Sequence, residues 1–283
     1  MTRRRLLAVD LDGTLLDRRG QPHERDLAAL RAAIREGVHV SIATGRLYSG
    51  TRAVAGLLGL RNAVACADGS HLVHALDHAT LVHHGIEGAE LELLRASLGR
   101  RPMPTFVFAS DAIGYDSAGA PFVEYVTTWS TDLRPHGDVL EHDLWRVAGG
   151  ITAAIALGTR EDVEGVSETL AQGASAAVRV VTFPVGRGGH TGKWALFARA
   201  SRGTKGTGLA FIAEHLDVAL EDTVCVGDWI NDVPMFEVAG GSFCMGQAPD
   251  EVKAKAKRVL DETVETGGGV ARAVEEEFGI RGQ

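Results

Sequence analysis

The stretch Val9–Asp17, which reads VDLDGTLLD, places three carboxylates directly after a short apolar run, Leu6–Val9. That run is typical of a buried strand, so Asp10 stands at the edge of a region that excludes water. An isolated carboxylate is very costly to bury unless it is hydrogen-bonded, paired or bound to a metal ion. Asp10 and Asp12 therefore need partners from elsewhere in the chain.

Three further segments carry polar side chains at the end of a predicted strand or at the start of a predicted helix. In open α/β sheets, ligands bind beyond the carboxyl ends of the strands, so we expect these segments to meet the one that contains Asp10. Between them they supply a hydroxyl, a lysine and two more carboxylates. The segments are Thr44-Gly45-Arg46, Thr204-Lys205-Gly206 and 227–232, which reads GDWIND.

Acidic side chains predominate in this set, and they would repel one another unless a cation lay between them. Oxygen ligands with room for water favour Mg²⁺ over zinc or a calcium cage. With Lys205, the hydroxyl of Thr44 and the backbone N–H groups of a helix expected after Gly45, the cation would form a socket for a phosphoryl group. One carboxylate could then attack phosphorus, and a second could exchange protons with the leaving alcohol and with water. The four acids are Asp10, Asp12, Asp228 and Asp232.

Apolar periodicity predicts alternating strands and helices towards both ends of the chain. Continuous apolar strands in such an alternation indicate a parallel sheet covered on both faces. We therefore expect an α/β core with a doubly wound, Rossmann-like parallel sheet. The predicted strands are Leu6–Val9, Val38–Ala43, Ala63–Cys66, Val224–Val226 and Ser242–Met245, and the predicted helices are Arg25–Glu36, Leu47–Leu58, Thr207–Leu216, Val233–Val238 and Pro249–Arg258.

The middle of the chain has its own alternation, which follows a hairpin-like stretch at His71–His84. Two strand–helix–strand groups of similar length indicate a compact insertion of about 110 residues, a common domain size. The glycine-rich stretch 186–192 (GRGGHTG) is typical of a returning hinge. We therefore expect residues 84–190 to form a smaller α/β domain, inserted between core segments 1–83 and 191–283.

The segments DLDGTLLD, ATGR, TKG and GDWINDVPM resemble, in order and spacing, the four motifs of the haloacid dehalogenase superfamily. Within it, the chain is similar to the Cof-type phosphatases, whose α/β cap is inserted between the second and third motifs. Here that interval runs from Arg46 to Thr204 and contains the predicted insertion. The resemblance implies a Mg²⁺-dependent phosphomonoester hydrolase that acts on a small phosphorylated metabolite, such as a sugar phosphate.

The resemblance also implies roles for the residues that match the motifs. Asp10 would be the nucleophile, forming an aspartyl-phosphate, and a magnesium ligand as well. Asp12 would be the general acid and base, with its backbone carbonyl on the metal. Thr44 would hydrogen-bond the transferring phosphoryl group, with the backbone of Gly45 beside it. Lys205 would neutralise both the nucleophile and the phosphate.

The fourth motif would complete the metal site. Asp228 would be a direct ligand, and Asn231 and Asp232 would orient it or its water molecules. Asp68 departs from the family, which usually has asparagine before the glycine at this point. We interpret Asp68 first as a turn residue and second as a substrate contact. Its carboxylate also adds negative charge near the site. Gln247 also stands where the family usually has asparagine.

The inserted domain carries no motif that identifies a substrate. Arg187 and His190 lie in or beside it, with Arg146 and Arg179, and could contact a second anionic group of the substrate. Charge alone motivates this expectation, and solvated side chains are the commoner case.

Composition narrows the class of partner. The chain has 283 residues and a formal net charge of −8, which argues against a nucleic-acid-binding protein. It has no apolar run of about 18 residues, so no membrane span is expected. Three widely spaced cysteines in apolar stretches predict buried free thiols rather than disulfides or a zinc site. We expect a cytoplasmic protein, and its oligomeric state is not readable from the sequence.

Three other functions fit part of the pattern. A phosphotransferase or phosphomutase of the same superfamily would use a sugar hydroxyl in place of water. A phospho-accepting switch module would also place Asp, Thr and Lys around Mg²⁺, but Asp12 favours rapid turnover of a phosphoaspartate. A dehalogenase is disfavoured because Asp12 and Thr14 suit phosphate chemistry better.

Overall fold

The computed structural model describes residues 5–173, 176–185 and 192–282. The chain folds into two compact units, each with its own apolar core. The domain boundaries expected at 83/84 and 190/191 stay a prediction, and the second falls at residues outside the described part of the chain. The first unit comprises Met1–Gly45, Arg52–Val82 and Gly203–Gln283, and the second comprises Arg46–Thr51 and His83–Arg202.

The first unit is built on a five-stranded parallel sheet in the order β14-β13-β12-β1-β2. Strand β1 (Leu6–Val9) lies inside this sheet, and all four of its residues are buried. A parallel strand that is covered on both faces exposes no side chain to water, and this explains why the sequence of β1 is apolar throughout. The other strands are β2 (His39–Ile42), β12 (Thr223–Gly227), β13 (Gly241–Cys244) and β14 (Arg258–Val259).

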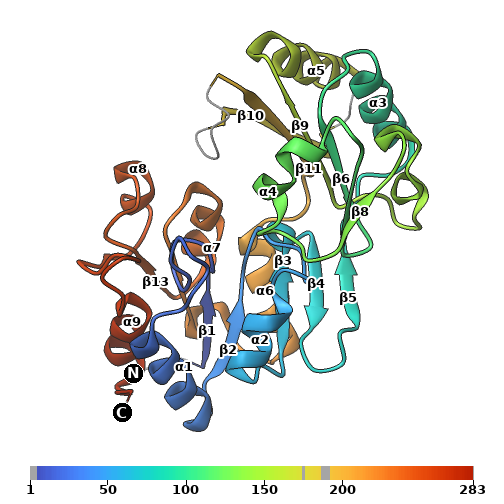
Figure 1. Ribbon diagram of the computed structural model, residues 1–283. Coiled ribbons are helices and arrows are strands. Elements are labelled where there is room, and N and C mark those ends of the chain that lie inside the picture. Colours follow the sequence, from blue (N-terminus) through green and yellow to red (C-terminus); the bar gives the residue numbers. More distant parts are fainter. Residues whose placement is uncertain (1–4, 174–175, 186–191, 283) are drawn as a thin grey trace. The chain divides into compact units, whose positions relative to one another are not determined.

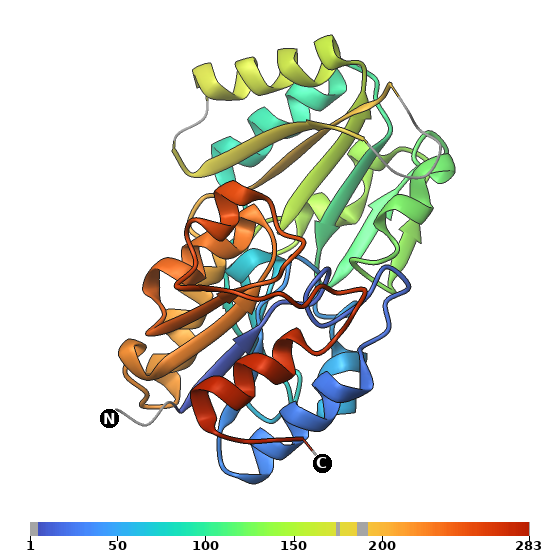
Figure 2. The ribbon, with the colours of Figure 1, turned by 90° about the vertical axis from the view of Figure 1, so that its left-hand side faces the viewer.

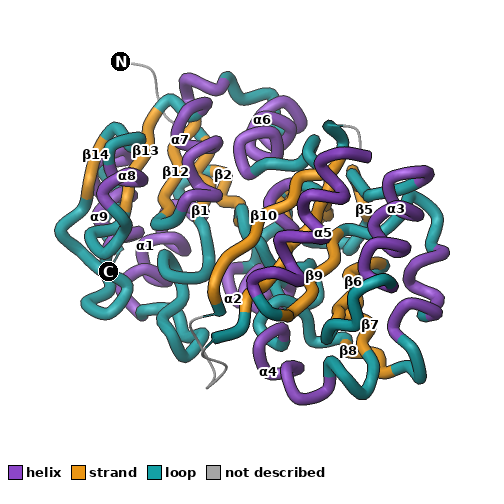
Figure 3. Tube along the Cα trace, turned by 90° about the horizontal axis from the view of Figure 1, so that it is seen from above, coloured by secondary structure: helices purple, strands orange, loops and turns teal. Residues whose placement is uncertain are grey.

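Helices cover both faces of this sheet, which is the doubly wound arrangement that the sequence predicted (Figure 3). On one face α1 (Glu24–Arg35) packs side by side with α9 (Gly269–Phe278), as Figure 2 also shows. On the other face α6 (Lys205–His215) packs against α7 (Val233–Val238). Two short helices complete this unit, α2 (Arg52–Leu58) and α8 (Asp250–Lys253).

A three-stranded sheet extends the first unit beyond β2. Strand β3 (Ala63–Cys66) runs parallel to the end of β2 through a bridge between Ala43 and Ala65. The backbone N–H of Thr44 donates to the carbonyl of Ala65 at 2.8 Å. The loops after β2 and β3 therefore lie at the same edge of the fold. The expected hairpin is present as β4 (His71–His74) and β5 (Thr80–His83).

The second unit contains a six-stranded sheet in the order β10-β11-β9-β6-β7-β8. Helices α3 (Gly88–Gly99) and α5 (Arg160–Gly173) pack together beside it, and Figure 1 shows the short α4 (Val123–Val126) apart from them. This is the smaller α/β fold that the sequence predicted. The strands are β6 (Thr105–Ala109), β7 (Ala112–Tyr115), β8 (Leu133–Pro135), β9 (Ala153–Gly158), β10 (Val178–Pro184) and β11 (Trp194–Ala200).

The helix predicted at Leu47–Leu58 was wrong in its first part, because α2 begins only at Arg52. Hydrogen bonds within the second unit hold the preceding residues in another conformation. The N–H of Leu47 donates to the carbonyl of Trp129 at 2.8 Å, and the N–H of Ser49 donates to the Asp111 carboxylate at 2.7 Å. The predicted helix N-terminus directly after Gly45, which was expected to bind phosphate, is therefore absent from the structure.

The helix predicted at Pro249–Arg258 was also too long. Helix α8 ends at Lys253, and Arg258–Val259 join the parallel sheet as its edge strand. The backbone N–H of Lys257 donates to the hydroxyl of Ser242 at 3.0 Å. Pairing with β13 thus outweighs the local helical preference of these residues.

Asp26 joins the two helices on one face of the first unit, and its replacement provides a stability prediction. Its buried carboxylate accepts hydrogen bonds from the N–H groups of Gly268 at 2.9 Å and Ala271 at 2.7 Å, at the start of α9. Asp26→Ala is expected to lower the free energy of unfolding by about 2 kcal/mol, because two buried donors lose their acceptor. Urea denaturation measures the change.

Glu24→Ala is the matched control, since Glu24 is an exposed acid of the same helix. Its effect on the free energy of unfolding is expected to stay within about 0.5 kcal/mol. Equal effects of the two substitutions would refute the capping role of Asp26.

Candidate active site

Two acids meet where the strand order of the first sheet reverses. From β1 the chain moves outward to β2, and it later returns to the other side of β1 as β12. Asp10 follows β1 and Asp228 follows β12, and the N–H of Asp10 donates to the carbonyl of Val226 at 3.0 Å. Such a reversal opens a crevice at the carboxyl ends of the strands, which is the usual ligand site of open α/β sheets.

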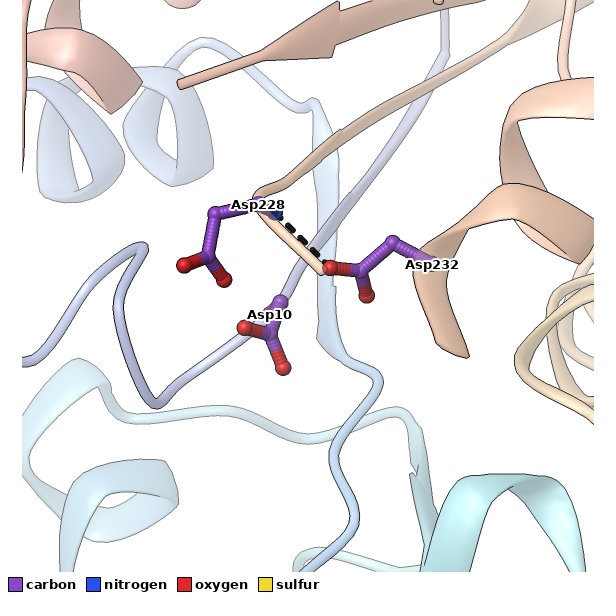
Figure 4. A group of neighbouring side chains, drawn as sticks. All are labelled: Asp10, Asp228 and Asp232. Atoms are coloured by element: carbon purple, nitrogen blue, oxygen red, sulfur yellow. Dashed lines mark hydrogen bonds between the residues drawn. The ribbon is translucent and has the colours of Figure 1, made fainter. Parts of the chain in front are cut away.

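Three carboxylates converge in this crevice (Figure 4). Asp10, Asp228 and Asp232 each place a carboxylate oxygen within 4.8 Å of the others. Their side chains come from the end of β1 and from the loop after β12. Asp12, two residues after Asp10, is exposed, so the two acids of the first motif have different surroundings.

Lys205 is the cation that these acids share. It is the first residue of α6, and its side chain is 1% exposed. The Nζ atom donates to Asp10 Oδ1 at 2.5 Å and to Asp232 Oδ1 at 2.6 Å. Burial by itself lowers the pKa of Lys205, but the negative charges of the neighbouring carboxylates raise it above its ordinary value, so the lysine stays charged.

Asp232 shapes the loop after β12. While its Oδ1 accepts from Lys205, its Oδ2 accepts from the backbone N–H groups of Asp228 at 2.8 Å and Trp229 at 2.9 Å. Both carboxylate oxygens therefore have donors within the chain. Gly227 permits this geometry, because a Cβ there would lie 2.4 Å from the Asp232 carboxylate carbon.

Asp228 is held from two other segments. Its Oδ1 accepts from the hydroxyl of Thr14 and its Oδ2 from Gln247 Nε2, each at 3.3 Å. Gln247 Nε2 also donates to the carbonyl of Gly13 at 2.6 Å. Gly13 has a φ of +90°, and a Cβ there would lie 2.3 Å from an Asp228 oxygen, so only glycine fits. Neither role could be read from the sequence around Thr14 or Gln247, because Asp228 is distant from Thr14 in the chain.

The acids carry more negative charge than Lys205 balances. Burial raises the pKa of Asp10 well above its ordinary value, although the charge of Lys205 opposes that shift. Burial and then the charge of Asp232 raise the pKa of Asp228 to about 6. A divalent cation would correct this imbalance, and an all-oxygen donor set suits Mg²⁺. The described residues therefore fit a magnesium ion.

The loops after β2 and β3 bring the remaining expected residues together. Thr44 is fully buried at the end of β2, with Gly45 next to it. The N–H of Asp68 donates to the carbonyl of Thr44 at 2.9 Å, and Asn231 Nδ2 donates to Asp68 Oδ1 at 2.7 Å. Asp68 is thus both a turn residue and the partner of an amide from the fourth motif. Arg187 and His190 lie outside the described residues.

A family model described as haloacid dehalogenase-like hydrolase matches residues 7–274. Phosphatase YwpJ of Bacillus subtilis is 25% identical over 268 residues, which cover 90% of this chain and 94% of that protein. A phosphoglycolate phosphatase of Methanopyrus kandleri is 26% identical over 269 residues, 94% of either chain. The matches therefore extend through both units.

Solved structures agree on the fold. A haloacid dehalogenase-like hydrolase of Bacteroides thetaiotaomicron superposes with a TM-score of 0.82 at 19% identity, covering 97% of this chain and 99% of that one. The sugar phosphatase BT4131, of HAD subclass IIB, superposes with a TM-score of 0.76 at 21% identity, with the same coverage. These two likenesses show the fold. The family match over residues 7–274 shows that the chain belongs to the haloacid dehalogenase-like hydrolase family, and together with its phosphatase relatives it identifies the chain as an enzyme of the phosphatase type.

Proposed function

We propose that the chain is a Mg²⁺-dependent phosphomonoester hydrolase that acts through an aspartyl-phosphate on Asp10. The observation that supports this most is the pairing of Asp10 with buried Lys205, beside Asp228 at the reversal of strand order. A nucleophilic carboxylate needs its charge held and one oxygen left for attack on phosphorus, and the hydrogen bond from Lys205 to Oδ1 of Asp10 supports that role. The proposed substrate is a small phosphorylated metabolite, such as a sugar phosphate.

Asp10, Asp228 and the backbone carbonyl of Asp12 would hold the magnesium ion. Asp232 is less suited to direct coordination, since its oxygens accept short hydrogen bonds from Lys205 at 2.6 Å and from two backbone N–H groups at 2.8 and 2.9 Å, whereas the hydrogen bonds to the Asp228 oxygens are 3.3 Å long. Asn231 and Asp232 would instead support the loop that carries Asp228. When bound, the ion supplies positive charge that offsets the clustered carboxylates and the phosphoryl oxygens.

The residues of the chain perform the following steps. Lys205 holds Asp10 Oδ1, which leaves Oδ2 to attack phosphorus. The new O–P bond forms as the ester P–O bond breaks, and Asp12 gives its proton to the leaving oxygen. Asp12 then takes a proton from a water molecule that attacks the aspartyl-phosphate, which releases phosphate and restores Asp10. Thr44 and the N–H of Gly45 donate to the phosphoryl oxygens throughout.

A direct assay tests this function. The purified chain is incubated with p-nitrophenyl phosphate and with a panel of phosphorylated metabolites, with Mg²⁺ or with EDTA. Free phosphate should appear only with Mg²⁺. Transfer of the phosphoryl group to a sugar hydroxyl without free phosphate would instead identify a phosphotransferase, and a stable acyl-phosphate would identify a switch module.

Magnesium is expected to stabilise the folded chain, because it relieves the repulsion among Asp10, Asp228 and Asp232. At a Mg²⁺ concentration one hundred times the Kd, the gain in free energy of unfolding is about 2.7 kcal/mol. Magnesium requires the ionised carboxylate, and the pKa of Asp228 is raised to about 6. The gain should therefore be full above pH about 7 and shrink as the pH falls through 6.

Differential scanning fluorimetry at pH 5 and pH 7.5, with and without Mg²⁺, measures this effect as a shift in Tm. Asp228→Asn is the variant expected to lose most of the shift. A Mg²⁺-induced shift that is the same at both pH values, or that survives in Asp228→Asn, would contradict the assignment of Asp228 as a ligand.

A further inference from the structure

The turn that follows β3 has an unusual backbone. Ala67, Asp68 and Gly69 have successive φ values of +48°, +54° and +85°. The left-handed region is unfavourable for residues with a Cβ atom, and here two such residues occur in succession. All three are buried. A strained turn of this kind persists only where contacts with its surroundings compensate for it, and such turns cluster at functional sites.

The turn contacts the loop after β2. The N–H of Asp68 donates to the carbonyl of Thr44 at 2.9 Å, next to the proposed phosphate-binding hydroxyl. A Cβ on Gly45 would lie 3.4 Å from Asp68 Oδ1, so the Asp68 carboxylate lies against this loop. The left-handed conformation of Asp68 thus brings both its backbone and its side chain to the second motif.

The turn also contacts the loop after β12. Asn231 Nδ2 donates to Asp68 Oδ1 at 2.7 Å. Asn231 directly precedes Asp232, whose carboxylate binds Lys205 Nζ and the backbone N–H of Asp228. Asp68 therefore fixes one end of the short segment that positions the proposed metal ligand.

The start of α6 packs directly on the same turn. A Cβ on Gly69 would lie 2.1 Å from the carbonyl oxygen of Thr204, and a Cβ on Gly203 would lie 2.1 Å from Ser70 Oγ. The backbone of the turn therefore packs against the backbone of residues 203–204, directly before Lys205. Burial lowers the pKa of Lys205, but the charges of Asp10, Asp232 and then Asp68 raise it, so Asp68 also acts on this lysine electrostatically.

We propose that the turn Ala67–Gly69 is a fifth segment of the active site, in which Asp68 is a positioning residue that acts through Asn231. It ties together the second, third and fourth motifs, each of which it contacts. Asp68 is in this view a support for the loop of Asp228, and not a substrate contact. The proposal rests on the proposed phosphatase function and adds to it the residue that holds three of its loops in place.

Four variants test the proposal: Asp68→Ala, Asn231→Ala, their combination and Asp68→Asn. Asp68→Ala and Asn231→Ala should each lower kcat for p-nitrophenyl phosphate by about tenfold, with KM changed by less than about threefold. The double variant should lose no more than either single one, because the two residues act as a unit. Asp68→Asn should restore kcat to within about threefold of the wild type, since asparagine tolerates the left-handed region and its Oδ1 can accept from Asn231.

Asp217→Ala is the matched control. Asp217 also has a left-handed backbone, with a φ of +51°, but it is exposed and outside the site. It should leave kcat and KM as they are. A decrease like that of Asp68→Ala would mean that backbone strain alone causes the loss, and it would overturn the proposal.

Three other results would overturn it: an unchanged kcat in Asp68→Ala, losses that multiply in the double variant, or a change in KM alone, which would make Asp68 a substrate contact. If the wild type hydrolyses no phosphate ester, the proposed function fails, and the coupling is then read from urea unfolding of the same four variants. Additive changes in unfolding free energy would show that residues 68 and 231 do not act together, and non-additive changes would support the unit.

Discussion

Asp10→Asn is expected to abolish turnover of p-nitrophenyl phosphate, with kcat reduced by at least about 10⁴-fold, the scale of loss when a nucleophile is removed. Asparagine keeps the shape of the side chain but offers no anionic oxygen to attack phosphorus. The fold should survive, because burial already raises the pKa of Asp10 and the ionised form is costly there. Lys205 keeps its second partner, Asp232, at 2.6 Å.

The measurement is release of p-nitrophenol under single-turnover and steady-state conditions, with urea unfolding in parallel. Asp217→Asn, on the surface and away from the site, serves as the control and should keep full activity. Retention of more than about one per cent of kcat in Asp10→Asn would reject Asp10 as nucleophile. Loss of the fold in that variant would instead show that its charge is needed for the pairing with Lys205.

Lys205→Met is expected to have the largest effect on stability. Methionine fills a similar space but leaves the carboxylates of Asp10 and Asp232 buried without a cation. Removing one partner of a buried ion pair costs about 3–5 kcal/mol, because the remaining charge is uncompensated. Activity should fall as well, since Asp10 Oδ1 loses the donor that orients it.

Urea denaturation measures the loss of stability, and the comparison with Lys255→Met isolates the role of burial. Lys255 is exposed, so its replacement should change the free energy of unfolding by less than about 0.5 kcal/mol. Combining Lys205→Met with Asp232→Asn should recover part of the loss, because one of the two unpaired charges is then gone. Lack of any recovery would mean that packing, rather than charge, makes Lys205 important.

The described part of the chain contains no helix long and apolar enough to cross a membrane. The cysteines expected as free thiols, Cys66, Cys225 and Cys244, are buried, and none of them forms a disulfide within the described part of the chain. Burial raises the pKa of Cys225, which disfavours the reactive thiolate.

Much of the first unit followed from local sequence. Short apolar runs such as Leu6–Val9 are typical of strands covered on both faces, and acids directly after such strands are expected at the carboxyl edge of the sheet. Glycine and polar residues indicated the positions at which the strands ended. Periodicity was a poorer guide where local preference was weak, as at Leu47–Thr51 and beyond Lys253, where long-range hydrogen bonds and strand pairing decided the conformation.

The sequence by itself predicted that Asp10, Asp228, Asp232 and Lys205 would come together, because strand and turn signals are local, but it also placed Asp12 with them, which is exposed and outside the cluster. Only the tertiary structure decided which donors hold each acid. Thr14 binds Asp228 across 214 positions of sequence and Asn231 binds Asp68 across 163, and such contacts leave no periodic trace. These hydrogen bonds form because crossover connections between parallel strands bring loops that are distant in sequence to the same edge of the sheet. A carboxylate that is buried there requires a hydrogen-bond donor.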